Sequence, residues 1–201
     1  EVGPNTEVLT VSDVNGNSST CSTTVTVQDN VAPVAICQDI TVQLENTGNA
    51  SMTPAQINNG SSDACGIAGL SLNNTVFNCA NVNGNTVTLT VTDVNGNSST
   101  CTANVTIQDN VAPIAICQDV TVQLNASGNG STTAAAVNNG SSDNCAIASL
   151  VLSQTAFVCS EVGANTEVLT VTDVNGNSST CSTTITVQDN VAPVAICQDI
   201  T

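Results

Sequence analysis

The chain has 201 residues, of which 16 are Asp or Glu and none is Lys, Arg or His, so its formal charge of −16 has no internal counter-charge. A surface this negative repels phosphate backbones and anionic headgroups, which argues against nucleic-acid binding and against direct membrane insertion of this segment. His, Lys, Tyr and Trp are all absent, so the usual catalytic bases and Schiff-base amines are missing and we expect no enzyme.

The chain repeats itself at an offset of 80 residues, which brings Cys21 onto Cys101 and Cys181. Near-identity in tandem is typical of a modular array. In chain order we predict the C-terminal part of a preceding copy (1–30), two complete copies (31–110 and 111–190) and the first strand of a following copy (191–201). The sequence opens in mid-pattern, so we expect an internal segment whose targeting signals lie elsewhere.

Each copy shows the period-two alternation of half-buried strands and no helical periodicity beyond one turn at 134–136. In the first complete copy the expected strands are 34–44, 51–57 despite Pro54, 67–72, 75–77, 86–92 and 102–108. Short strands separated by Asn, Gly and Ser clusters predict an all-β fold: immunoglobulin-like β-sandwich repeats joined end to end as a rod. One aromatic residue in each copy, Phe77 or Phe157, is expected at the centre of the core.

Ten cysteines without a C-x-x-C pair indicate disulfides formed in an oxidising compartment. Four cysteines in a copy allow three connectivities, and we favour one on geometry. The first and last strands of such a sandwich can run side by side in parallel, while the other two cysteines flank a local strand pair. The predicted bridges are Cys37 to Cys101, Cys65 to Cys79, Cys117 to Cys181 and Cys145 to Cys159. Cys21 and Cys197 are expected to pair with neighbouring copies.

Three acidic loops recur in register and should meet at one end of each sandwich. Carboxylates crowded together without a basic partner repel one another, and a hard cation that takes 6 to 8 oxygen ligands turns this repulsion into attraction. We therefore predict Ca²⁺ at each junction, with Asn side chains completing the shell. The predicted ligands are Asp29, Asn30, Asp63, Asp93, Asn95 and Asn97 at the first junction, and Asp109, Asn110, Asp143, Asp173, Asn175 and Asn177 at the second. The alternative is that these loops serve only as turns, since Asn-Gly is a strong hairpin signal.

The stretches V-Q-D-N-V-A-P-V-A-I-C at 27–37 and D-V-N-G-N-S-S-T-C at 93–101 resemble the hyalin repeat, in the form found in tandem in giant surface adhesins of Bacteroidota. The resemblance covers the whole chain and implies an extracellular, immunoglobulin-like, adhesive or fibre-forming role. The linker also resembles cadherin junctions, in which Asp-Asn-Ala-Pro holds calcium. Asp29, Asn30, Ala32 and Pro33 match that pattern, with Val31 inserted.

These features predict a structural stalk or filament segment of a secreted or cell-surface protein. Its partners would be neighbouring repeats of the same chain, or identical chains in a filament. The alternative is a module that binds glycans or surfaces through exposed Thr, Ser and Asn side chains. Against this alternative, each copy lacks the aromatic platform that usually stacks on sugars.

Overall fold

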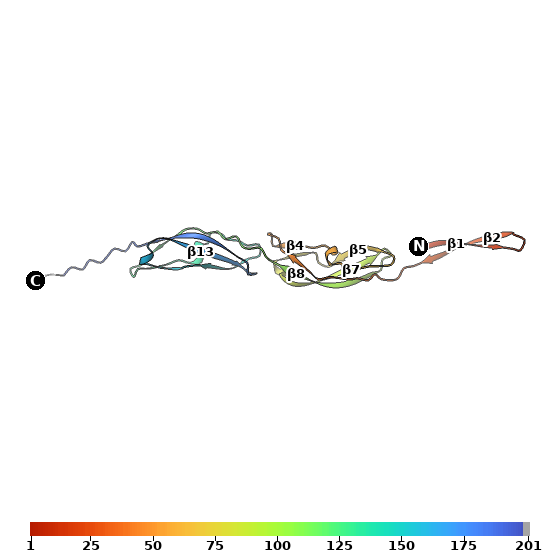
Figure 1. The fold of residues 1–201 in the computed structure, drawn as a ribbon, viewed down its shortest axis with the longest axis horizontal. Helices are drawn as coiled ribbons and strands as arrows, with labels where there is room; N and C mark the ends of the chain where they lie inside the picture. Colours follow the sequence, from red (N-terminus) through yellow and green to blue (C-terminus); the bar gives the residue numbers. More distant parts are fainter. Residues whose placement is uncertain (199–201) are drawn as a thin grey trace. The chain divides into compact units, whose positions relative to one another are not determined.

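The computed structural model describes residues 1–198 and shows an all-β, sandwich-like fold in which every helix is a single turn (Figure 1). Two compact units can be distinguished. Unit 1 comprises Glu1–Ile40, Met52–Thr75 and Gly84–Thr106; unit 2 comprises Thr41–Ser51, Val76–Asn83 and Ile107–Thr201. The predicted boundaries at 31–110 and 111–190 follow the sequence repeat instead, and they stay a prediction.

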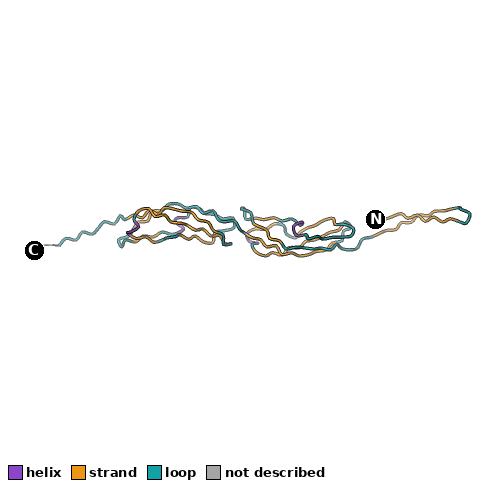
Figure 2. Tube along the Cα trace, in the orientation of Figure 1, coloured by secondary structure: helices purple, strands orange, loops and turns teal. Residues whose placement is uncertain are grey.

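The same succession of elements occurs twice along the chain, as the alternation of strand, helical turn and loop shows (Figure 2). The first series consists of β3 (Ile40–Gln43), β4 (Asn49–Ser51), α1 (Pro54–Ile57), β5 (Ile67–Leu72), β6 (Val76–Asn78), η1 (Cys79–Asn81), β7 (Asn83–Asp93) and β8 (Ser98–Gln108). The second consists of β9 (Val120–Gln123), β10 (Asn129–Ser131), α2 (Ala134–Val137), β11 (Ile147–Leu152), β12 (Ala156–Val158), η2 (Cys159–Glu161), β13 (Gly163–Asp173) and β14 (Ser178–Gln188).

Each series builds one four-stranded and one two-stranded sheet. In the second series the strand order is β11-β13-β14-β9, with β10 paired to β12; the first series has the equivalent orders β5-β7-β8-β3 and β4-β6. The first strand β9 runs parallel to the last strand β14, with Val120 opposite Ile185. The prediction of the Cys117 to Cys181 bridge assumes this parallel pairing of the first and last strands.

The core of unit 2 lies between the four-stranded sheet β11-β13-β14-β9 and the two-stranded sheet β10-β12. Leu169 and Val171 on β13 and Ile185 on β14 are fully buried, because alternate side chains of a strand point to the same face. Phe157 is 1% exposed and packs in the same cluster, as expected. The aliphatic residues Val122, Leu124, Val137, Leu152 and Val187 complete it.

Among residues 1–198, no second sheet covers the N-terminal hairpin of unit 1. β1 (Gly3–Ser12) pairs antiparallel with β2 (Ser18–Val27), with Leu9 opposite Cys21. Leu9 is 61% exposed, although the residues at the equivalent position of the repeat, Leu89 and Leu169, are both fully buried. The sequence alternation is therefore the same, but the apolar face of this hairpin is open to solvent.

Three sequence predictions differ from the structure. The expected strand at 51–57 is split into the end of β4 and the helical turn α1, because Pro54 lacks an N–H and suits the first helical position, where the Gln56 side chain accepts a hydrogen bond from the Thr53 N–H. The expected strand at 34–44 is regular only in β3 and otherwise forms isolated bridges. In 191–201, residues 191–198 form no strand and residues 199–201 lie outside the described part.

Within 1–198, none of the helices has the length and apolar character needed to span a bilayer.

Candidate functional site

Three carboxylates from separate loops meet in unit 2. Asp109, Asp143 and Asp173 each place one oxygen within 4.8 Å of the others. Asp109 is 5% exposed and Asp173 is 2% exposed, so two of the three charges are withdrawn from water. The chain contains no basic side chain that could neutralise them. Like charges this close to one another destabilise the fold unless a cation or hydrogen-bond donors compensate.

Asp173 is positioned by the turn that ends β13. Its Oδ1 accepts the backbone N–H groups of Asn175 and Asn177, both at 2.8 Å, and its Oδ2 accepts the Asn177 side-chain amide at 2.7 Å. Gly176 completes the turn at φ 96°, a left-handed conformation that glycine adopts without steric cost. The Asx turn therefore fixes this carboxylate before any ligand arrives.

Asp109 follows β8 and receives donors from two later loops. Its Oδ1 accepts the Asn144 side-chain amide at 3.2 Å, and its Oδ2 accepts the Asn175 side-chain amide at 3.2 Å. Its backbone carbonyl accepts the Asn177 side-chain amide at 3.1 Å. The linker after the first sequence copy is thus held against two loops of the second copy, all within unit 2.

Asp143 provides the oxygen that lacks a partner. Its Oδ2 accepts the backbone N–H groups of Cys145 at 2.8 Å and Ala146 at 3.1 Å. Its Oδ1 is buried and accepts no hydrogen bond from any residue of 1–198. A buried carboxylate oxygen without a donor costs free energy, and a bound cation would remove that cost.

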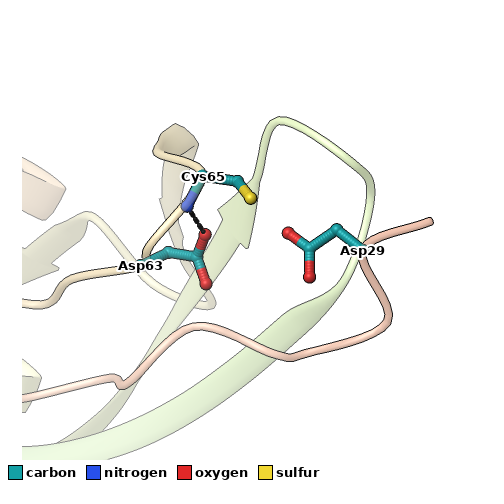
Figure 3. Close-up of side chains that lie close together, drawn as sticks. All are labelled: Asp29, Asp63 and Cys65. Atoms are coloured by element: carbon teal, nitrogen blue, oxygen red, sulfur yellow. Dashed lines mark hydrogen bonds between the residues drawn. The ribbon is translucent and has the colours of Figure 1, made fainter. Parts of the chain in front are cut away.

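The equivalent group in unit 1 contains a thiol. Asp29, Asp63 and Cys65 bring ligand atoms within 4.8 Å of one another (Figure 3). The Cys65 backbone N–H donates to Asp63 Oδ1 at 2.7 Å, while the Cys65 sulfur faces the Asp29 carboxylate (Figure 3). A hydrogen bond to Asp29 raises the pKa of the Cys65 thiol, and burial and the charges of Asp29, Asp63 and Asp93 raise it further. Asp29 Oδ2 is another buried oxygen without a donor among the described residues.

Asp93, predicted as a ligand beside Asp29 and Asp63, sits in the turn that ends β7. Burial acts to raise its pKa, but hydrogen bonds from the Asn97 side chain and from the backbone N–H groups of the turn outweigh burial and hold the pKa below its usual value. The Asn97 side-chain amide also donates to the Asp29 carbonyl at 3.1 Å. Asp93 is therefore linked to this group through Asn97, although it is not one of its three members.

The predicted asparagine ligands act mainly as donors. The side-chain amides of Asn97, Asn175 and Asn177 donate to carboxylates or carbonyls, whereas Asn95 contributes its backbone N–H to Asp93. The Asn110 side chain turns away and donates to Gln43 Oε1 at 2.7 Å, and Asn30 is exposed. An ion at either group would therefore be bound by carboxylate oxygens first.

The turn of the hairpin β1–β2 has the same hydrogen bonds as the turn at Asp173, but its carboxylate, Asp13, belongs to neither acidic group. The effect of these hydrogen bonds on a carboxylate can therefore be tested at Asp13. The Asn17 side chain donates to Asp13 Oδ2 at 2.8 Å, and this bond is the main reason that the pKa of Asp13 lies below 3.8. We expect Asn17→Ala to raise the pKa of Asp13, measured by carboxyl carbon NMR during an acid titration. Because the folded pKa is lowered, this turn is stabilised above pH 3.8 and loses that stabilisation as pH falls through the folded pKa.

Asn15→Ala is the matched control, because Asn15 donates only its backbone N–H to Asp13. An Asp13 pKa that both variants leave unchanged would contradict the role assigned to the Asn17 amide.

Two of the four predicted disulfides are present in the structure. The other two are absent, and one bridge that was not predicted is present. Cys37 bonds to Cys101 and Cys117 to Cys181, with Cα atoms 5.8 and 5.9 Å apart. The predicted Cys65 to Cys79 and Cys145 to Cys159 bridges are wrong. Cys79 instead bonds to Cys145, with Cα atoms 5.4 Å apart, and both residues belong to unit 2. Among the described residues, the exposed cysteines without a disulfide are Cys21, Cys65, Cys159 and Cys197.

The physical reason for this correction lies in the positions of the loops. The Asn144 backbone carbonyl lies against Gly48 and Cys79, so the 142–145 loop is seated beside Cys79. Sequence spacing predicts that Cys65 and Cys79 flank a local strand pair of one copy, and it gives no sign that a loop of the next copy lies beside Cys79.

Neither a protein-family model nor a curated protein matches the chain. Among solved structures it is similar to mouse clustered PcdhgC3 (EC1-3), with a TM-score of 0.37 and 12% identity over 92% of this chain and 77% of that chain. It is similar to the protocadherin GammaB4 extracellular domain (TM-score 0.40, 14% identity, 92% and 39% coverage) and to a three-domain immunoglobulin segment of titin (0.36, 10%, 92% and 75%). TM-scores and sequence identities this low carry no argument about the function of this chain.

Proposed function

We propose that this chain is a segment of a structural stalk or filament of a secreted or cell-surface protein. Disulfides fix each repeat, and Ca²⁺ held by the acidic loops stiffens the linker between repeats. Neighbouring repeats of the same chain and identical chains are its partners. The resemblance of residues 27–37 and 93–101 to hyalin repeats supports this role, and the disulfides fit an oxidising, extracellular compartment.

The observation that carries the proposal is the Asp109, Asp143 and Asp173 group. Three carboxylates from a linker and two loops lie within 4.8 Å in a chain without a single basic side chain, and one buried oxygen has no donor among residues 1–198. Carboxylate oxygens are among the ligands that Ca²⁺ prefers, and each Asp can supply one or two of them. An ion here would join the 109–111 linker to the loops at 143 and 173.

The same structure disfavours selective glycan recognition. The chain has two phenylalanines and neither Trp nor Tyr, and Phe77 and Phe157 are each 1% exposed. A sugar-binding surface usually relies on an exposed aromatic ring. A structural role needs no such surface.

Calcium removal tests the proposal. At a free Ca²⁺ concentration about 100 times the dissociation constant, we expect the native state to gain about 2.7 kcal/mol, which calorimetry would record as a higher melting temperature than in a chelator. Isothermal titration of the chelator-treated protein should show saturable binding. Asp143→Asn should weaken that binding by about tenfold or more, because it removes the charge of the oxygen that lacks a donor.

Glu7→Gln is the matched control, since it removes the same charge from the exposed strand β1. Equal loss of calcium affinity in both variants would indicate diffuse attraction to a negative surface. Calcium that produces no heat and no change in melting temperature would rule out the stiffening mechanism.

A further inference from the structure

The Cys79–Cys145 bridge ends in the same loop that supplies a carboxylate to the acidic group of unit 2. In this loop, 143–146 (the bridged loop), Asp143 Oδ2 accepts the backbone N–H groups of Cys145 at 2.8 Å and Ala146 at 3.1 Å. Cys145 is in turn bonded to Cys79, with Cα atoms 5.4 Å apart. The position of the Asp143 carboxylate therefore depends on a backbone segment that a covalent bond holds in place.

The other end of the bridge forms a seat for the bridged loop. The Cys79 sulfur lies 3.5 Å from the Asn144 carbonyl oxygen. A Cβ at Gly48, whose φ is 73°, would lie 2.6 Å from the same oxygen and 2.9 Å from the same sulfur, so glycine is needed for this close approach. The Asn144 side-chain amide also donates to the Glu45 carbonyl at 3.3 Å. The bridged loop is thus held against the turn that contains Glu45 and Gly48, all within unit 2.

The bridged loop carries two buried oxygens that lack a donor. Asp143 Oδ1 and Asn144 Oδ1 accept no hydrogen bond from any residue of 1–198. The Asn144 amide nitrogen donates to Asp109 Oδ1 at 3.2 Å, which links this loop to a second member of the acidic group. Asp173 is positioned by its own Asx turn and does not depend on the bridge, whereas Asp143 moves with the bridged loop.

A bound ion and the bridge would connect the same two parts of the chain. The ion would join Asp109, on the linker after the first sequence copy, to Asp143 and Asp173 of the second copy, while the bridge joins Cys79 of the first copy to Cys145 of the second. Once one connection is closed, the other forms in a structure that is already constrained, so it costs less conformational entropy. By thermodynamic linkage, each connection strengthens the other by the same factor.

We infer that the Cys79–Cys145 disulfide positions Asp143 for calcium and so sets the calcium affinity of the Asp109, Asp143 and Asp173 group. This inference rests on the proposed calcium site and assigns its regulation to one bridge. Two molecules of a small thiol reduce the bridge: its sulfurs gain two electrons and two protons and become thiols, and the reductant becomes a disulfide. The reduced chain binds calcium weakly, and oxidation raises its affinity. Tight calcium binding is therefore confined to an oxidising compartment.

Calcium titration of the full chain tests the inference. Cys79→Ser with Cys145→Ser should raise the calcium dissociation constant of this group by about tenfold or more, because groups that orient a metal ligand contribute this much to affinity. The backbone amide resonances of Asn175 and Asn177 give the dissociation constant, since both amides donate to Asp173 and report on this group locally.

The matched control is Cys37→Ser with Cys101→Ser. It removes a bridge of similar sequence separation, 64 against 66 residues, from unit 1, and should leave the dissociation constant of the unit 2 group unchanged. Equal dissociation constants with and without the Cys79–Cys145 bridge would overturn the inference and leave the calcium site standing. Calcium that shifts neither amide in the oxidised parent chain would instead contradict the calcium site itself.

Gly48→Ala tests the seat while the bridge stays in place. Its Cβ would displace the Asn144 carbonyl, so calcium binding should again weaken by about tenfold. Gly128→Ala is the control, because Gly128 has the same position in the repeat and a φ of 74°, and a Cβ there would meet Cys159 Sγ but none of the acidic residues of 1–198. Equal losses in the two glycine variants would reflect backbone strain alone and would overturn the inference.

The reciprocal measurement distinguishes positioning from a general effect on folding. In a glutathione redox buffer, saturating calcium should make the reduction potential of the Cys79–Cys145 bridge more negative by about 30 mV for each tenfold difference in affinity. Differential alkylation followed by mass spectrometry measures the reduced fraction of each bridge, and the Cys37–Cys101 bridge should show no shift. A Cys79–Cys145 potential that is the same in calcium and in a chelator, although calcium binds the oxidised chain, would refute the coupling.

Discussion

Leu169→Ala is expected to lower the free energy of unfolding by about 2–5 kcal/mol, the range for removing a buried leucine side chain. Leu169 is fully buried between the sheets of unit 2, where Val171 and Ile185 belong to the same cluster. The loss combines the transfer free energy of the removed methyl groups with the cavity that the sheets leave behind. Urea denaturation followed by circular dichroism, with hydrogen exchange of the β13 and β14 amides, would measure it.

Leu9→Ala is an unusually close control, because Leu9 occupies the same position of the repeat within an almost identical sequence. Its side chain is 61% exposed, so we expect a change of less than about 0.5 kcal/mol. Comparable losses at both positions would mean that the hairpin β1–β2 is covered in solution, which would contradict the exposure of Leu9 in the structure.

Removal of the Cys117–Cys181 bridge is expected to cost about 2–5 kcal/mol, measured as the urea midpoint of the Cys117→Ser, Cys181→Ser variant. The bridge closes a loop with a sequence separation of 64 residues, so it restricts the unfolded chain strongly. It also joins the start of a copy to its last strand, near the parallel pair β9–β14. Loss of the bridge should therefore increase hydrogen exchange first along β9.

Cys21→Ser, Cys197→Ser is the control for this experiment, because these cysteines are free and exposed. The pair has the same chemistry and the same repeat positions, but it closes no loop in this chain. A midpoint that falls equally in both double variants would show that serine substitution itself, and not the cross-link, is responsible.

Much of the fold follows from local sequence patterns. The alternation of apolar and polar residues placed the long strands that became β7 and β8, because strand periodicity reports directly which face is buried. The single aromatic residue of each copy marked the core, and Phe77 and Phe157 are both buried there. The convergence of Asp109, Asp143 and Asp173 could also be expected, since a sandwich brings its linker and two of its loops to one end.

The remaining features depend on contacts that periodicity does not encode. The Cys79–Cys145 bridge arises because Gly48 lets the Asn144 backbone approach, and the positive φ of Gly48 is visible only in the folded chain. Sequence reasoning also misses the Cys65 thiol beside Asp29 and Asp63, because it pairs Cys65 with Cys79 in a disulfide. Glycines at equivalent positions of two copies, such as Gly48 and Gly128, were the available signal for a close approach.

The three bridges together have a topological consequence for the backbone. Cys79 lies inside the loop closed by Cys37 and Cys101, and Cys145 lies inside the loop closed by Cys117 and Cys181. A nick at any single peptide bond between Cys37 and Cys181 is therefore spanned by at least one S–S bond. A protease that cuts once in this region therefore releases no fragment. The same cut in a linker between domains that no disulfide joins would separate them.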